Sequence, residues 1–160
     1  LMGAGTILRE VRFAAEILRN EFDVEADVWS VTSVNELTRD GQRATRWNML
    51  NPTAAQRKPY ITQALEGAEG PFIISTDNLK TYSEQLRAYI PGHYTVLGTE
   101  GFGRSDTRTQ LRHFFEVNRY FVVVAALKSL ADQGKIKADV VAKAIKKFGI
   151  DPEKADPMSV

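Results

Sequence analysis

The chain has 160 residues, with 21 basic against 20 acidic side chains and no cysteine. This length suits one domain, and the balanced charge argues against a nucleic-acid partner, which usually requires a large basic excess. The lack of cysteine excludes disulfides and thiolate metal sites. The longest apolar runs, 72–74 and 121–127, fall short of the ~18 residues of a membrane span, so we expect a cytoplasmic protein without a membrane partner.

The first third of the sequence predicts two strands around a helix. Leu1–Gly5 is apolar and small, as at the end of a buried strand, and we therefore expect a piece of a longer polypeptide. Residues 28–34 form a β-rich run and predict the second strand. Between them, residues at three- and four-residue spacing predict a helix with one buried face: Ile7, Val11, Ala14, Ala15, Leu18 and Phe22.

A polar stretch over residues 38–58 has little periodicity and is predicted as a long connection. It contains three apolar residues that are unusual in a free loop: Trp47, Met49 and Leu50. An interface explains such residues more readily than loop chemistry does, although packing inside the domain is the alternative.

The middle of the chain alternates short helices and strands. A helix over 60–65, a strand over 72–76 and a strand over 94–98 are predicted. An amphipathic helix before the last strand is predicted from Leu79, Tyr82, Leu86 and Ile90. The loop Gly101–Phe102–Gly103 follows, and Ser105 and Asp106 are expected to cap a helix that carries Leu111, Phe114 and Phe115.

The C-terminal part predicts two more helices and a tail. The first covers about 121–132, and the second buries Val141, Ala144, Ile145 and Phe148. Strands that alternate with helices favour parallel pairing and right-handed crossovers. We therefore predict a three-layer α/β/α domain over 1–150 with about four parallel strands, and a polar tail over 151–160 that frays.

Motifs for chemistry are weak. Gly3-Ala4-Gly5 lacks the third glycine of a dinucleotide site, because Leu8 stands there, and it is interpreted as a tight turn. The segment 98–105 has the spacing of a phosphate-binding loop, with Arg104 in place of the lysine. A weak anion site is therefore kept as an alternative, but the segment does not fit a loop that hydrolyses nucleotides. His93 and His113 lack paired carboxylates and are interpreted as structural or surface residues.

Several stretches together resemble one family. They are residues 5–11 (GTILREV), 30–33 (SVTS), 46–52 (RWNMLNP), 75–77 (STD), 98–106 (GTEGFGRSD) and 111–117 (LRHFFEV). In this order they look like the C-terminal domain of the homodimeric pyruvate dehydrogenase E1 component, within the transketolase superfamily. The 98–106 loop alone indicates the superfamily, and the 46–52 segment narrows it to this E1 type.

The resemblance implies a function that this chain shares with other domains. Such an enzyme binds thiamine diphosphate and magnesium between two preceding domains, decarboxylates pyruvate and reductively acetylates the lipoyl group of the E2 dihydrolipoyl acetyltransferase. None of the family's cofactor ligands or catalytic histidines maps onto this sequence, so the isolated chain is expected to bind no cofactor and to be inactive. The family sheet has an antiparallel first strand at its edge, and this chain is expected to begin after it, with the Leu1–Gly5 strand central.

Two surfaces are expected to contact the missing domains or the second subunit. One is the Trp47, Met49 and Leu50 cluster. The other is the loop of Gly101, Phe102, Gly103, Arg104, Ser105 and Asp106, interpreted as a structural turn from which Arg104 reaches a neighbour. The alternative function is a free-standing module that binds an anionic ligand at the Gly101–Asp106 loop.

Overall fold

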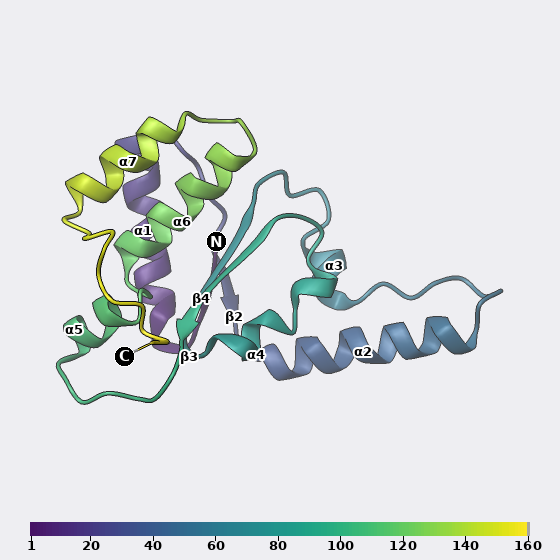
Figure 1. Ribbon diagram of the computed structural model, residues 1–160. Coiled ribbons are helices and arrows are strands. Elements are labelled where there is room, and N and C mark those ends of the chain that lie inside the picture. Colours follow the sequence, from purple (N-terminus) through teal and green to yellow (C-terminus); the bar gives the residue numbers. More distant parts are fainter. Residues whose placement is uncertain (160) are drawn as a thin grey trace.

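Four strands pair into one parallel sheet in the computed structural model, which describes residues 1–159 (Figure 1). They lie in the order β2-β1-β3-β4 and cover β1 (Met2–Ala4), β2 (Trp29–Val31), β3 (Phe72–Leu79) and β4 (Tyr94–Thr99). Met2 lies opposite both Trp29 and Ile74, and each pairing is parallel. The predicted α/β class and the internal position of the first strand are confirmed.

One face of the sheet is covered by α1 (Leu8–Phe22), α6 (Arg119–Asp132) and α7 (Ala138–Lys147), with α5 (Arg108–Phe114) near the carboxyl ends of the strands (Figure 1). A 3-10 turn, η1 (Gly5–Ile7), leads from β1 into α1. Within the predicted stripe, Ile7, Val11, Ala14 and Leu18 are fully buried on the side that packs against α6, whereas Ala15 and Phe22 are only partly buried. Each fully buried Leu, Ile or Val contributes about 1.5–3 kcal/mol, so this layer stabilises the domain strongly.

The opposite face is covered by the start of α2 (Val34–Leu50) and by three short elements, α3 (Tyr60–Ala64), α4 (Lys80–Glu84) and the 3-10 turn η2 (Arg87–Tyr89). Here Ile61, Leu65 and Leu86 pack on Ile74 and Val96 of the sheet. Only the N-terminal part of α2 lies on the sheet, and Figure 1 shows the rest of this helix projecting away from the body together with the chain that returns from its tip. None of the helices in residues 1–159 is long and apolar enough to cross a membrane.

The long connection predicted over 38–58 is wrong, because most of it is the helix α2. Ser33 caps this helix by accepting a hydrogen bond from the Glu36 amide. Its buried residues are Thr38, Gly41 and Ala44, which have helical spacing but are small or polar. A search for large apolar residues therefore finds no period there.

Two further predictions need correction. The helix predicted from Leu79 to Ile90 is two short turns, α4 and η2, and Leu79 ends β3 and remains half-exposed. Fraying is predicted for the whole tail, but within its described part, 151–159, Lys154 is anchored by bonds to the carbonyl of Phe114 and to Glu116. The division into a domain over 1–150 and a tail over 151–160 stays a prediction.

Candidate interaction surfaces

The loop between β4 and α5 lies at the carboxyl end of the sheet and contains the predicted Gly101–Asp106 site (Figure 1). All six residues of Gly101–Asp106 are exposed, and the exposed fraction of Phe102 is 93%. Gly101 has a φ of 68°, a left-handed conformation that side chains disfavour, so glycine suits the turn. The turn therefore presents an aromatic ring to the surroundings.

Arg104 and Asp106 make contacts within their own segment. The Arg104 guanidinium carbon lies 5.3 Å from the ring centroid of Phe114 on α5. Asp106 accepts a 2.6 Å hydrogen bond from the Thr107 amide. The cap of α5 is Thr107, whose hydroxyl accepts from the Gln110 amide, so the prediction that Ser105 or Asp106 caps this helix is wrong. Ser105, Asp106 and Thr107 all have capping chemistry, and sequence alone does not choose between them.

A buried carboxylate, Glu10, fixes α5 and the start of α6 against α1. Glu10 is 5% exposed and accepts hydrogen bonds from Arg112 Nη1 at 3.0 Å and from Arg119 Nε at 2.9 Å. It also accepts from the Arg119 backbone amide at 3.1 Å. The Arg119 guanidinium carbon lies 4.0 Å from the ring centroid of Phe13 on α1. Charge and hydrogen bonding thus join three helices at one point.

The pKa of Glu10 reflects two opposing effects. Burial alone raises this pKa because it disfavours the charged form. The hydrogen bonds and charges of Arg119, with the charge of Arg112, outweigh burial, and the net result is a lowered pKa. The same interaction raises the pKa of Arg119, so the two charges stabilise each other.

This network extends to the carboxyl ends of β1 and β3. Thr6 donates to Asp77 Oδ2 at 3.1 Å, and Ser75 donates to the Val117 carbonyl at 3.2 Å. The family-like segments 5–11, 75–77 and 111–117 therefore meet in space and bond to one another. Their shared role here is to hold the fold, and sequence reasoning missed it. The available signal was Glu10, a carboxylate that stands three residues after Ile7 in an apolar stripe.

The outer part of α2 carries the predicted Trp47, Met49 and Leu50 cluster. Trp47 is half-buried under Arg57, whose guanidinium carbon lies 4.1 Å from the centroid of the indole ring. The Asn48 side chain bonds to both the amide and the carbonyl of Arg57, which ties the returning chain to the helix. Met49 and Leu50 remain 70% and 55% exposed at the tip. The cluster thus divides into one residue that stabilises the arm and two that are free for contact.

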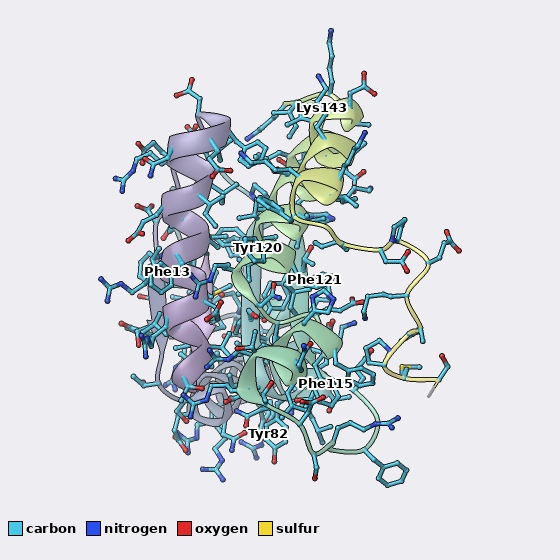
Figure 2. The ribbon with its side chains drawn as sticks, turned by 90° about the vertical axis from the view of Figure 1, so that its left-hand side faces the viewer. Phe13, Tyr82, Phe115, Tyr120, Phe121 and Lys143 are labelled. Atoms are coloured by element: carbon cyan, nitrogen blue, oxygen red, sulfur yellow. The ribbon has the colours of Figure 1, made fainter. Side chains whose placement is uncertain are left out.

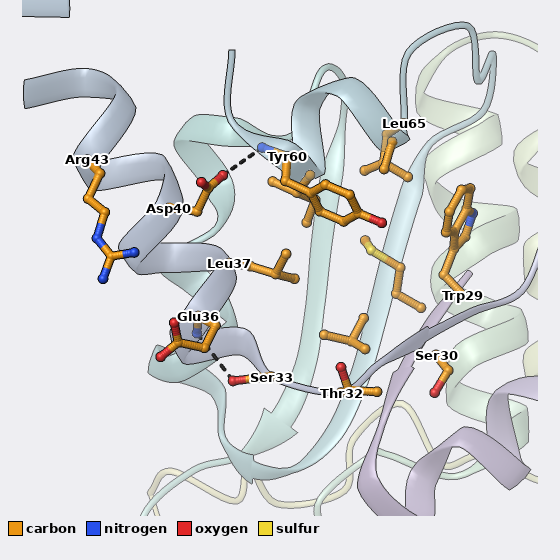
Figure 3. A pocket seen from close by; sticks show the side chains of 14 residues that line it. Trp29, Ser30, Thr32, Ser33, Glu36, Leu37, Asp40, Arg43, Tyr60 and Leu65 are labelled. Atoms are coloured by element: carbon orange, nitrogen blue, oxygen red, sulfur yellow. Dashed lines mark hydrogen bonds between the residues drawn. The ribbon is translucent and has the colours of Figure 1, made fainter. Parts of the chain in front are cut away.

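A groove beside the edge strand β2 was not predicted. It has a volume of about 490 Å³ and lies between β2, α2 and α3. Figure 3 shows Tyr60 and Trp29 facing each other across it, and these residues are 65% and 39% exposed. Asp40 accepts a hydrogen bond from the Tyr60 amide and so joins α2 to α3 at the rim. Within residues 1–159 nothing pairs with the outer edge of β2.

The described residues offer little for reaction chemistry. Across residues 1–159 no group of three or more His, Cys, Asp or Glu side chains is arranged to hold a metal. His113 packs edge-on against Phe121 with ring centroids 5.6 Å apart, which supports a structural role. At the dinucleotide-like turn, a Cβ on Gly3 would lie 2.7 Å from the Leu8 Cα, so this glycine permits close packing of β1 and α1.

Comparison with known proteins gives consistent results. A family described as "Transketolase-like TK C-terminal domain" matches residues 1–118. The chain is 57% identical over 159 residues to a pyruvate dehydrogenase E1 component of Pseudomonas aeruginosa, with 99% of this chain and 18% of the relative covered. It is 52% identical over 160 residues to the pyruvate dehydrogenase E1 component of Cupriavidus necator, a match that covers 100% of this chain and 18% of the relative. It is 55% identical over 158 residues to the pyruvate dehydrogenase E1 component of Escherichia coli K12, a match that covers 98% of this chain and 18% of the relative.

The chain therefore spans about a fifth of the length of the curated relatives that it matches. The four-stranded parallel sheet flanked by helices is consistent with these matches. The resemblance stated from the motifs is confirmed, and the chain belongs to the transketolase-like C-terminal domain family.

Proposed function

We propose that the chain is the C-terminal, non-catalytic domain of a pyruvate dehydrogenase E1 component. The observation that carries this proposal is the 57% identity that extends over 99% of the chain but over only 18% of an E1 relative. The whole enzyme decarboxylates pyruvate with thiamine diphosphate and magnesium, and passes the acetyl group to the lipoyl group of the E2 dihydrolipoyl acetyltransferase. It acts in the cytoplasm as a homodimer.

The residues of this chain do not fit the cofactor. Magnesium and a diphosphate require oxygen ligands and a phosphate cradle, and no cluster of carboxylates in residues 1–159 is arranged for a metal. The phosphate-loop-like segment has Arg104 in place of lysine and leads into α5, which has only seven residues. Asp106 already places a carboxylate on the amide at that helix start. We derive no catalytic step from this chain.

The domain contributes docking surfaces instead. Phe102 on the loop, and Met49 and Leu50 on the α2 arm, are large apolar residues exposed at two separate projections. Such residues are favourable contacts for the preceding domains or the second subunit, because burying them removes apolar surface from water. The groove beside β2 is a third surface, and we propose that the preceding part of the polypeptide covers it.

The alternative, an independent module that binds an anion at Gly101–Asp106, is not favoured. A carboxylate stands in that loop, and Arg104 stacks on Phe114. Calorimetric titration of the isolated chain with thiamine diphosphate, magnesium or inorganic pyrophosphate separates the two functions. We expect no binding up to millimolar ligand, and the full-length enzyme is the positive control. Stoichiometric binding to the isolated chain at micromolar affinity contradicts the proposal.

A further inference from the structure

The C-terminal segment after α7 returns to the carboxyl end of the sheet. In Figures 1 and 2 this segment descends from α7, passes α5 and α6 and ends near the loop that follows β4. Residues 151–159 form no helix or strand. The side-chain hydrogen bonds that join this segment to α5 and the turn after it come from Lys154.

Lys154 is a polar anchor in a mostly buried place. Its side chain is 17% exposed, and its ammonium donates to Glu116 Oε1 at 2.8 Å and to the Phe114 carbonyl at 3.1 Å. The ammonium also lies 5.8 Å from the ring centroids of both Phe114 and Phe121. The Phe114 carbonyl belongs to the end of α5, where carbonyls lack partners within the helix and a cation is favourable.

The acceptor turn is itself built for this contact. Glu116 has a φ of 62°, a conformation that residues other than glycine rarely adopt. Its amide bonds to the His113 carbonyl, and the adjacent Val117 amide bonds to the Arg112 carbonyl. The turn therefore presents the Glu116 carboxylate to Lys154 from a backbone that these two hydrogen bonds hold in place.

Beyond Lys154 the tail meets the Gly101 loop. A Cβ built on Gly101 would lie 3.2 Å from the Pro157 carbonyl oxygen, so these two backbones are in close contact. The next residue on each segment is large, apolar and exposed: Phe102 at 93% and Met158 at 65%. The two side chains thus start from neighbouring points, although they are far apart in the sequence.

We propose that residues 151–159 are a strap, latched by Lys154, that positions the Gly101–Asp106 loop and adds Met158 to the docking surface of Phe102. The partner is the preceding part of the same polypeptide, because this chain matches only 18% of its relatives' length and most of such a polypeptide therefore lies outside it. This inference rests on the proposed function for its partner. The latch itself does not, because its contacts lie within residues 114–157.

Hydrogen–deuterium exchange of the full-length enzyme tests the latch. Lys154→Met keeps the apolar stem but removes the ammonium, and we expect the amides of 101–106 and 155–159 to exchange about tenfold faster. Lys154→Arg retains a cation and restores most of the protection. Lys143→Met, on the exposed face of α7 (Figure 2), leaves both segments unchanged. Unaltered exchange in β3 shows that a variant is folded. If Lys154→Met does not fold, Lys154→Gln, which also removes the ammonium, takes its place.

Faster exchange in 155–159 with no change in 101–106 overturns the proposal, because the tail then does not position the loop. Docking is measured separately, by the effect of Phe102→Ala and Met158→Ala on protection of the preceding domains. If these variants change nothing while Lys154→Met loosens the loop, the latch stands and the docking partner is wrong. If Phe102→Ala and Met158→Ala weaken docking but Lys154→Met leaves amide exchange in 101–106 unchanged, Lys154 is not the latch.

Discussion

Glu10 is the residue on which the carboxyl end of the sheet depends. Three groups donate to its carboxylate, from Arg112 on α5 and from the side chain and amide of Arg119 at the start of α6. A buried ion pair adds little net stability compared with an apolar core, but loss of one partner leaves the other charges buried and unpaired. The main effect of the network is therefore to fix which helices meet, and in which orientation.

Glu10→Gln tests this network. We expect a loss of about 3 kcal/mol in the free energy of unfolding, the low end for a broken buried pair because Arg119 keeps some access to water. Glu25→Gln, at an exposed position just after the same helix, is the matched control and changes stability by less than about 0.5 kcal/mol. Urea unfolding at pH 7 measures both. Equal effects of the two substitutions contradict the assigned role.

The native protein and Glu10→Gln together also test the direction in which the pKa of Glu10 is shifted. The pKa of Glu10 is lowered in the folded protein from an ordinary value of 4.5. A lowered carboxyl pKa contributes stability that is complete above the unfolded pKa and is lost as the pH falls through the folded pKa. The stability difference between the native protein and Glu10→Gln should therefore be constant from pH 7 to about 5 and shrink below pH 4.5. A difference that grows with acidity contradicts the lowered pKa.

At the scale of elements, the parts that sequence predicted and the part that it missed differ in the size of their buried residues. The α1 and α7 stripes contain Val, Leu, Ile and Phe at helical spacing, and these helices lie where the pattern predicts. The buried face of α2 contains Thr38, Gly41 and Ala44, so its period carries no hydrophobic signal. The tail gave no signal either, because its anchor Lys154 is a charged residue whose acceptors lie about forty positions away.

The candidate site shows the same contrast. The sequence indicated which loop and which apolar cluster stand at the surface, and both contain strongly exposed residues. It did not indicate that Trp47 is held by Arg57, or that Arg104 lies over Phe114, because these contacts depend on how separate segments fold back. Their function as interfaces stays a prediction that the full-length enzyme has to test.

Gly41→Ala tests why α2 has a glycine at its centre. Alanine favours a helix by about 1 kcal/mol over glycine, but a Cβ here would lie 2.4 Å from the Tyr89 ring. We expect the ring to be displaced and the protein to lose about 1 kcal/mol of stability. In a Tyr89→Ala background the same change should instead stabilise, because the obstacle is gone. Stabilisation in both backgrounds, measured by thermal unfolding, contradicts the close packing of α2 on η2.

At the scale of the whole molecule, the domain joins a rigid centre to exposed projections. The sheet, α1 and α6 form a well-buried core, and the Glu10 network closes its carboxyl end. The loop after β4 and the tip of α2 extend from this core and present Phe102, Met49 and Leu50. This arrangement agrees with the proposed function, in which the domain supports the assembly of a larger enzyme and other domains carry the chemistry.

Sedimentation velocity and thiamine diphosphate titration of the full-length enzyme, on the same samples, test this account most directly. We expect Arg104→Ala and Leu50→Asp each to weaken the dimer by about tenfold or to loosen domain packing, with cofactor affinity within about twofold of the native enzyme. Lys143→Met, an exposed α7 substitution, serves as the control and changes neither quantity. A large loss of cofactor affinity in Arg104→Ala, with the dimer intact, would show instead that the Gly101–Asp106 loop belongs to the active site.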